Sequence, residues 1–321
     1  MSINLDSFKK SRVLVVGDVM VDEYTWGEVE RISPEAPVPV VSVVSETATL
    51  GGAGNVAANL AALGARVSVA AVSGTGPAGR VLKRLFSDMG VDTTGVFSDE
   101  TRPTTRKTRV IAVNQQVVRI DRETRRPITD AQEREIAGFV EGRLKDTDVV
   151  LISDYGKGLL TPGLLGRVIG ACSKAGKMVI VDPKGRDYER YKGAFAITPN
   201  RREAALATGV EISDRASLMV AGANLLSSVG AQWVLVTCGK DGMAAFSNHE
   251  PPVFISAEAR QVFDVSGAGD TVLAVLGLGL AAGASFSEAS RLANTAGGIV
   301  VGKVGTATVS VAELATAVKR Q

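Results

Sequence analysis

Asp264-Val265-Ser266-Gly267-Ala268-Gly269-Asp270-Thr271 leads directly into the longest mostly apolar run of the chain, Val272 to Ala284. The pattern predicts a buried helix that begins with glycines. The first backbone N–H groups of a helix have no partners and carry partial positive charge, so a glycine-rich helix start can hold an anion such as a phosphoryl group. Asp270 would stand beside that group and could take a proton from an attacking hydroxyl. A plain helix start with Ser266 as its cap would explain the same string.

The rest of the chain alternates β-branched runs with helical patterns. The predicted strands are Arg12–Val16, Val67–Val72, Val149–Ser153, Met178–Val181, Ala194–Thr198 and Trp233–Thr237. The predicted helices include Asn55–Leu63, Asp130–Leu144, Pro162–Ala175 and Ser217–Val229. Several strands are apolar almost throughout, as expected for strands covered on both faces. We therefore predict an α/β fold with a mostly parallel central sheet.

Two segments break this alternation, Val38–Val44 and Thr104–Ile120. Both are rich in strand-forming residues, and both alternate polar and apolar positions in the way that suits an exposed antiparallel sheet. We interpret them as a small β-sheet lid. The chain shows no repeat and no linker of biased composition, so we predict a single domain over residues 1–321 that carries this lid.

Composition excludes several classes of protein. Hydrophobic residues make up 45%, charged residues 22%, and the formal net charge is +2, so neither nucleic acid nor a membrane is an expected partner. The cysteines Cys172 and Cys238 are far apart in the chain and suit a reducing compartment. His249, the single histidine, lies in a polar turn-like stretch and is a poor candidate for a nucleophilic triad. With no signal peptide visible at the N-terminus, we expect a cytoplasmic protein.

Two glycine-rich motifs resemble a known family. The string that ends in Asp270 is similar to the second signature of the PfkB, or ribokinase-like, carbohydrate kinases, and Gly51-Gly52-Ala53-Gly54-Asn55-Val56-Ala57-Ala58-Asn59-Leu60-Ala61-Ala62-Leu63-Gly64 is similar to the first. The resemblance implies a three-layer αβα sandwich that uses ATP and Mg²⁺. It also implies that Asp270 is the catalytic base and that Gly267, Ala268 and Gly269 hold the migrating phosphoryl group. In the family, residues equivalent to Gly51, Gly52 and Asn55 contact the sugar.

Weaker motifs extend the resemblance over most of the chain. Asn200-Arg201-Arg202-Glu203 is similar to the family's Asn-x-x-Glu motif, which acts on magnesium through water and on the phosphates, and its i, i+3 spacing puts both side chains on one helix face. Thr237 to Gly242 resembles the nucleotide-phosphate loop, with Thr237, Gly239 and Gly242 at its bends. Asn294 lies in a segment that resembles the helix bordering the adenine in the family. Asp18 and Asp22 occupy positions where family members bind sugar hydroxyls. Each of three motifs also has a simpler explanation. Asn200 to Glu203 would fit a solvated helix start, Thr237 to Gly242 a hairpin turn, and Asp18 with Asp22 a pair of turn carboxylates.

Four further segments indicate a phosphorylated acceptor. They are Gly17–Tyr24, Arg31–Val40, Ser153–Gly158 and Asp182–Gly185, and they resemble a branch of the family that acts on the anomeric hydroxyl of a sugar phosphate. Such a substrate needs cationic partners. The candidates are Arg106, Lys107 and Arg109 on the lid and Lys157 and Lys184 in loops. Strand alternation puts Lys107 and Arg109 on one face and Arg106 on the other, and which face points inward stays open.

Other functions fit the sequence less completely. Gly52 to Ala57 fits a dinucleotide-binding fingerprint, but the required acid about 20 residues later is missing, and the chain has no P-loop motif. A ribokinase-like or fructokinase-like sugar kinase remains an alternative, as does a non-catalytic sugar sensor, although Asp270 favours catalysis. The lids of relatives pair between subunits, so we expect a homodimer. A requirement for a monovalent cation stays open.

Overall fold

The computed structural model describes residues 4–113, 115–258 and 262–320, and its main sheet has nine strands in the order β13-β12-β11-β10-β9-β8-β1-β4-β5. The strands are β1 (Arg12–Gly17), β4 (Arg66–Gly74), β5 (Asp92–Asp99), β8 (Val149–Ser153), β9 (Met178–Asp182), β10 (Ala196–Ile197), β11 (Trp233–Thr237), β12 (Met243–Ser247) and β13 (Val253–Ile255). All neighbours pair in parallel except β11 with β12 and β12 with β13. The mostly parallel sheet predicted from the sequence is confirmed.

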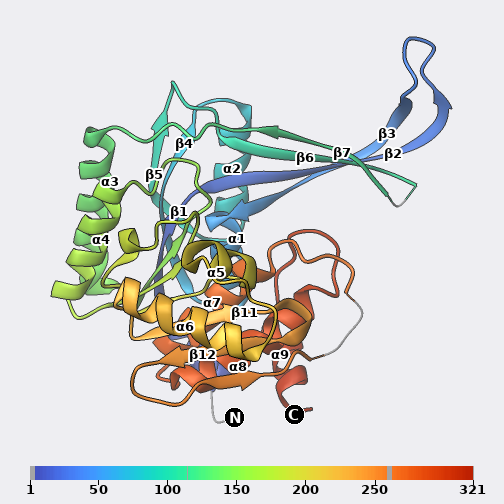
Figure 1. Cartoon of the computed structure of the whole chain (residues 1–321). Helices are drawn as coiled ribbons and strands as arrows, with labels where there is room; N and C mark the ends of the chain where they lie inside the picture. Colours follow the sequence, from blue (N-terminus) through green and yellow to red (C-terminus); the bar gives the residue numbers. More distant parts are fainter. Residues whose placement is uncertain (1–3, 114, 259–261, 321) are drawn as a thin grey trace.

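Helices cover both faces of this sheet (Figure 1). On one face lie α1 (Ala53–Ala62), α2 (Pro77–Asp88), α7 (Ala268–Ala281), α8 (Phe286–Val300) and α9 (Val311–Val318), and on the other lie α3 (Asp130–Arg143), α4 (Pro162–Lys174), α5 (Arg201–Thr208) and α6 (Arg215–Val229). Short 3-10 helices are η1 (Leu5–Lys10), η2 (Leu144–Asp146), η3 (Glu189–Tyr191) and η4 (Gly239–Asp241). Along β1, Val13 and Val15 enter the first core and Leu14 and Val16 enter the second, as strand alternation requires. The predicted three-layer αβα fold is confirmed.

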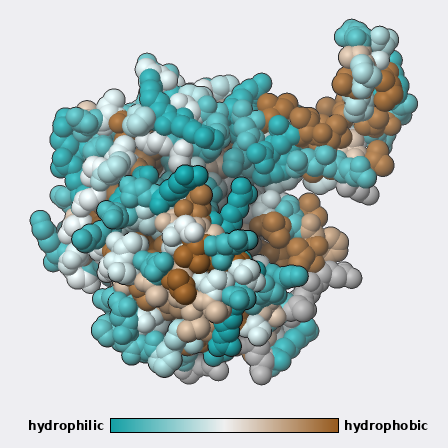
Figure 2. Space-filling view, in the orientation of Figure 1, coloured by the Kyte–Doolittle hydropathy of each residue, from teal (hydrophilic) through white to brown (hydrophobic). Residues whose placement is uncertain are grey.

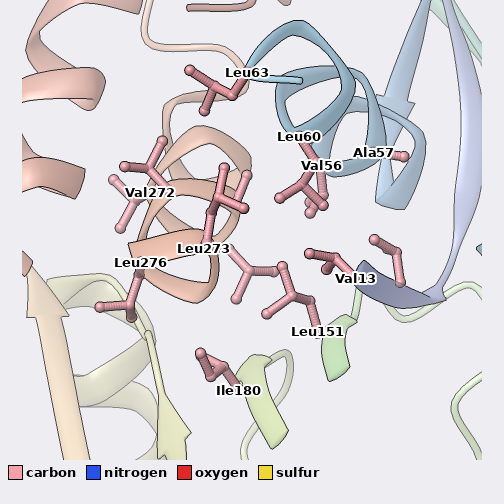
Figure 3. Close-up of a cluster of buried hydrophobic side chains, with 14 of the residues drawn as sticks. Val13, Val56, Ala57, Leu60, Leu63, Leu151, Ile180, Val272, Leu273 and Leu276 are labelled. Atoms are coloured by element: carbon pink, nitrogen blue, oxygen red, sulfur yellow. The ribbon is translucent and has the colours of Figure 1, made fainter. Parts of the chain in front are cut away.

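The core between α1, α7 and the sheet fixes the two glycine-rich helix starts (Figure 3). Val56 and Leu60 on α1 and Leu273 and Leu276 on α7 are completely buried, and they pack over Leu151 of β8. Truncating one of these leucines to alanine would cost about 2 to 5 kcal/mol of folding free energy. The first turns of α1 and α7 are therefore held rigidly against each other.

A second sheet of four strands forms the lid and projects from the body of the molecule (Figure 1). Its order is β3-β2-β6-β7, with β2 (Val19–Ile32), β3 (Pro39–Gly52), β6 (Thr105–Ala112) and β7 (Gln115–Arg122). The predicted lid segments fall in β3, β6 and β7; residue 114 lies outside the described residues. Two expectations need correction. The prediction missed β2, whose first residues are buried like those of a core strand. It also expected an antiparallel lid, whereas β2 pairs with β6 in parallel, because β6 returns to the lid only after β5.

The topology brings several strand ends to one edge. The chain leaves β1 toward β4 and β5 on one side and later adds β8, β9, β10 and β11 on the other, so the strand order reverses at β1. Ligands of open α/β sheets bind at the carboxyl ends of the strands near such a reversal. Among the helices that the structure describes, none combines the length and the apolar character needed to cross a membrane.

Candidate active site

Asp270 lies in the first turn of α7 and is only 1% exposed. The amide of Asn55, on α1, donates a hydrogen bond of 2.9 Å to Oδ2 of Asp270, and the hydroxyl of Tyr155, just after β8, donates one of 2.9 Å to Oδ1. Gly267 is the N-cap of α7 with φ +77°, and a Cβ there would lie 2.4 Å from Nδ2 of Asn55. Only glycine therefore allows this junction of the two helices.

Burial decides the protonation behaviour of this carboxylate. Loss of water raises the pKa of Asp270 to about 7, and the nearby negative charge of Asp22 adds to the rise. Hydrogen bonds from Asn55 and Tyr155 and the positive charge of Lys107 act in the opposite direction. A carboxylate with a pKa near neutrality is well matched to accepting a proton at cellular pH. Burial also raises the pKa of Tyr155, so its hydroxyl stays protonated and remains a donor.

A second amide orients the first. Asn59, one turn after Asn55 on α1, donates from Nδ2 to the backbone oxygen of Asn55 at 2.9 Å and to its Oδ1 at 3.2 Å. Oδ1 of Asn59 in turn accepts from the hydroxyl of Thr271 at 3.1 Å and from the backbone N–H of Val309 at 3.3 Å. Because the oxygen of Asn55 is occupied by a donor, its nitrogen is the end that faces Asp270. Asn59 had no assigned role in the sequence, since a polar residue on a buried helix face has no diagnostic spacing.

The lid supplies the acidic group expected on the sugar side. Asp22, on β2, is 3% exposed and receives a 2.7 Å hydrogen bond from Nη1 of Arg109 on β6. The guanidinium of Arg109 also lies over the ring of Tyr24, 5.3 Å from its centroid. A Cβ at Gly51 would lie 2.3 Å from Oδ2 of Asp22, so the predicted glycine serves a close approach between β3 and β2.

Asp18 has a different environment from the one predicted. Its carboxylate accepts hydrogen bonds from the backbone N–H groups of Tyr155 at 3.0 Å, Lys157 at 3.0 Å and Leu159 at 3.3 Å. Gly52, with φ +58°, packs on the backbone oxygen of Asp18, where a Cβ would lie at 2.5 Å. The carboxylate of Asp18 thus shapes the loop after β8, and both of its oxygens are engaged by protein amides.

The predicted cations separate into different places. Arg106 lies on the face of β6 opposite to Lys107 and pairs with Glu23 at 3.4 Å, because strand alternation turns its side chain away from Asp270. Lys107 faces inward, with its ammonium 5.5 Å from the ring centroid of Tyr155. Lys157 pairs with Glu123 at 2.6 Å and is close enough to lower the pKa of Lys107, which burial lowers most.

Lys184 lies on the other side of the site. Its Nζ is 2.6 Å from Oε1 of Glu203, a residue predicted to act on magnesium and the phosphates. Glu203 and Asn200 form a reciprocal cap at the start of α5: the backbone N–H of Asn200 donates to Oε2 of Glu203 at 3.0 Å, and that of Glu203 donates to Oδ1 of Asn200 at 2.9 Å. The position of Lys184 therefore differs from the predicted one beside the sugar phosphate.

Asp182, at the end of β9, is a further acidic group; it begins the segment Asp182–Gly185 noted in the sequence, where no role was predicted for its carboxylate. Burial raises the pKa of Asp182, and the negative charges of Glu203 and Asp270 raise it further. Neighbouring carboxylates such as Asp182 and Glu203 suit a divalent cation, since Mg²⁺ typically uses one or two carboxylates together with phosphate oxygens and water. Over the residues described, no group of three or more metal-ligating side chains occurs.

A cleft of about 450 Å³ lies beside the start of α7. Its lining includes four of the six residues predicted for the nucleotide, Thr237, Gly239, Gly242 and Asn294, together with Ala268 and Gly269, whereas Asn200 and Glu203 are not part of it. Val262, Val265, Val272 and Val301 give it an apolar wall. Mostly apolar walls with a few polar groups are typical of small-molecule sites of this size. The cleft reaches the residue before Asp270, Gly269.

Comparison with known proteins gives one family. Residues 10–313 match the family model described as pfkB family carbohydrate kinase. A protein of Desulfatibacillum aliphaticivorans named bifunctional protein HldE is 59% identical over 98% of this chain, and one of the same name from Geobacter metallireducens is 54% identical over 94%. The chain spans only 64% and 61% of those two proteins.

Solved structures share the fold at low sequence identity. The ribokinase of Arabidopsis thaliana, complexed with ribose and ATP, superposes with a TM-score of 0.76 at 24% identity, covering 96% of this chain and 99% of that one. Phosphofructokinase-2 from Escherichia coli, in complex with substrates and products, gives 0.80 at 20% identity, covering 97% and 99%. These likenesses concern the fold.

Proposed function

Because the chain belongs to the pfkB family of carbohydrate kinases, we propose that it uses ATP to phosphorylate the anomeric O1 of D-glycero-β-D-manno-heptose 7-phosphate. The product would be heptose 1,7-bisphosphate, on the route to ADP-heptose and the lipopolysaccharide core. The segments Gly17–Tyr24, Arg31–Val40, Ser153–Gly158 and Asp182–Gly185 support this substrate through their resemblance to heptose 7-phosphate kinases. The observation that carries the kinase assignment is Asp270, buried and held by two donors beside the nucleotide cleft.

The proposed reaction moves one proton and one phosphoryl group. Asp270 accepts the proton of the O1 hydroxyl as O1 attacks the γ-phosphorus of ATP, and the bond from that phosphorus to the β–γ bridging oxygen breaks to release ADP. We assign the backbone N–H groups at Gly267 to Gly269 to the charge on the migrating group, which the start of α7 would stabilise. Mg²⁺, when bound, neutralises phosphate charge, and the carboxylates of Asp182 and Glu203 with the cap residue Asn200 would hold it, in part through water.

The acceptor's own phosphate requires cations on the sugar side. Lys107 and Lys157 meet this need, since they lie close to each other and the ammonium of Lys107 stands over Tyr155, whose hydroxyl contacts Asp270. Glu123 neutralises Lys157 when no ligand is present, and an incoming phosphate would compete with that carboxylate. Asp22 would accept from a sugar hydroxyl, and closure of the lid would exclude water that could otherwise accept the phosphoryl group.

Assembly as a homodimer is part of the proposal. Apolar side chains lie along the projecting lid (Figure 2), among them Val43 at 58%, Val44 at 69% and Val118 at 46% exposed. Both edge strands of the lid, β3 and β7, are unpaired on their outer sides in the described sheet, and pairing with a second lid would cover apolar surface and strand edges together.

The two cysteines are free and buried, which supports the expected reducing, cytoplasmic location.

A coupled assay for ADP release over a panel of sugars and sugar phosphates tests the function. We expect the highest kcat/KM with heptose 7-phosphate and a phosphorus NMR spectrum of the product that shows a new phosphate on the anomeric carbon. Highest activity with an unphosphorylated sugar, or with a different sugar phosphate, would reject the heptose assignment while keeping the family. ATP-dependent turnover of no sugar at all would reject the proposed function.

A further inference from the structure

Tyr155 touches two parts of the site that the family motifs do not connect. We propose that Tyr155 is a positioning residue with two separate tasks: its hydroxyl orients the carboxylate of Asp270, and its ring holds the ammonium of Lys107. This inference rests on the proposed function, because it gives the base and the phosphate-binding lysine the roles assigned above. It explains how the lid and the base are aligned by a single side chain.

The backbone at Tyr155 is fixed from both sides. Its N–H donates to Oδ2 of Asp18 at 3.0 Å. The preceding residue, Asp154, is 3% exposed and accepts from the N–H of Gly156 at 2.7 Å and from the hydroxyl of Tyr191 at 2.7 Å. The carboxylate of Asp18 therefore positions the loop from which the side chain of Tyr155 reaches Asp270.

The hydroxyl of Tyr155 and the amide of Asn55 each donate to a different oxygen of the Asp270 carboxylate. Tyr155 donates to Oδ1 and Asn55 to Oδ2, each at 2.9 Å, so the plane of the carboxyl group is fixed from two directions. Each oxygen keeps a further lone pair for the proton of the acceptor hydroxyl. Both donors stabilise the charged form of Asp270. The other charged groups that face Asp270 are Asp22 on the lid, Lys107 and Asp182.

The ring acts on a different partner. Nζ of Lys107 lies 5.5 Å from the ring centroid, within the range in which an ammonium is attracted by an aromatic face. Lys107 is half-buried, and burial lowers its pKa. A contact that favours the charged ammonium therefore also favours phosphate binding. Lys107 is carried by β6 of the lid, whereas Tyr155 follows β8 of the main sheet. The contact therefore joins the two sheets.

Two substitutions separate the two tasks. Tyr155→Phe removes the hydroxyl and keeps the ring, whereas Tyr155→Leu removes both. For Tyr155→Phe we expect the acid limb of kcat/KM to move up by about one pH unit, as for a lost hydrogen bond to a charged group, with the KM for heptose 7-phosphate changed less than about twofold. For Tyr155→Leu we expect the same displacement of the limb together with a KM raised about threefold to fivefold.

A measurement without turnover keeps this test independent of the proposed function. Carbon-13 NMR titration of labelled aspartate carboxyl groups, with the Asp270 resonance identified by its loss in Asp270→Asn, should show the same upward shift of the pKa in Tyr155→Phe. Tyr188→Phe is the matched control, because it removes the hydroxyl of another buried tyrosine, one that has no hydrogen-bond partner among the described residues, and it should not move the Asp270 titration.

The outcomes are distinct. An unchanged Asp270 titration in Tyr155→Phe would overturn the role of the hydroxyl, and equal KM values in the Phe and Leu variants would overturn the role of the ring. If the wild-type protein phosphorylated no sugar while the titration shifted as expected, the proposed function would fail and the tyrosine–carboxylate contact would stand.

Discussion

The amide of Asn55 donates a 2.9 Å hydrogen bond to Oδ2 of Asp270, across 215 positions of sequence. This bond joins the first turns of α1 and α7, which are the two glycine-rich motifs of the chain. The motif that would approach the sugar and the motif that would hold the phosphoryl group therefore meet at one carboxylate. Both helix starts are set by the same buried core, so the geometry of the base depends on packing as much as on hydrogen bonds.

Replacing the base should abolish most of the activity. For Asp270→Asn we expect kcat to fall by roughly 10² to 10⁴, the usual contribution of a general base, while calorimetric affinity for ATP is unchanged or tighter because a negative charge near the phosphates is removed. Asp88→Asn, the same change at an exposed residue at the end of α2, should keep wild-type kinetics. A kcat within threefold of wild type for Asp270→Asn would exclude Asp270 as the base.

The same variant should be more stable than the wild type at high pH. The folded-state pKa of Asp270 is raised to about 7, above the unfolded value, so its favourable contribution is present below about pH 4 and is lost as the pH rises toward 7. The amide introduced by Asp270→Asn could still accept from Asn55 and could donate to the hydroxyl of Tyr155. We expect this variant to gain on the order of 1 to 3 kcal/mol of unfolding free energy at pH 8.

Denaturant unfolding of both proteins at several pH values measures this difference. The gain should shrink as the pH falls through 7 and should vanish near pH 4. The wild-type acid limb of kcat/KM should have its midpoint near pH 7 for the same reason. A wild-type limb near pH 4, together with equal stabilities at pH 8, would contradict the environment that the structure gives to Asp270.

Glycine at the start of α7 should be irreplaceable for a reason beyond backbone strain. Gly267 and Gly283 both have positive φ, at +77° and +86°, but a Cβ at Gly267 would lie 2.4 Å from Nδ2 of Asn55, whereas nothing lies within 4 Å at Gly283. Gly283→Ala should cost about 1 kcal/mol of unfolding free energy and leave kcat near normal. Gly267→Ala should add a loss of kcat of at least roughly tenfold because Asn55 must move from Asp270. Equal kcat values in the two variants would show that the clash has no catalytic consequence.

The sequence predicted the parts of the fold that local patterns control. The strands β8 and β11 have the predicted bounds, because each is a short apolar run closed by polar residues. The strand β2 was missed, since its first half is buried against the main body and its second half is exposed on the lid, so neither alternation nor a continuous apolar run extends through it. Its parallel pairing with β6 depends on tertiary structure that no local pattern encodes.

In the candidate site, too, local sequence patterns predicted some residues, whereas the place of others depends on tertiary structure. Glycine-rich motifs predicted Asp270 and Asn55 because their chemistry is tied to a helix start. Tyr155 follows β8 and Asp182 ends β9, in segments for which the sequence predicted no role for either side chain. Their importance appears only when β8 lies between β9 and β1 in the sheet. Lysines are the hardest to assign, since a long side chain reaches in several directions. Lys184 was expected beside the sugar phosphate and instead lies against Glu203.

The two loop lysines should therefore affect different substrates. Lys157 neighbours Lys107 on the sugar side, so Lys157→Ala should raise the KM for heptose 7-phosphate by roughly tenfold or more, as for the loss of one charged phosphate contact, with little change in the KM for ATP. Lys184 is 2.6 Å from Glu203, so Lys184→Ala should raise the KM for ATP with Mg²⁺ and leave the sugar-phosphate KM nearly constant.

Arg106→Ala serves as the control for lost lid charge, because its side chain pairs with Glu23 on the face turned away from Asp270. It should leave both KM values within about twofold. Full kinetic matrices, with each substrate varied at several concentrations of the other, separate the two effects. If Lys184→Ala raised only the KM for the sugar phosphate, the loop after β9 would have to reach across the site on substrate binding, and its contact with Glu203 would belong to the ligand-free state alone.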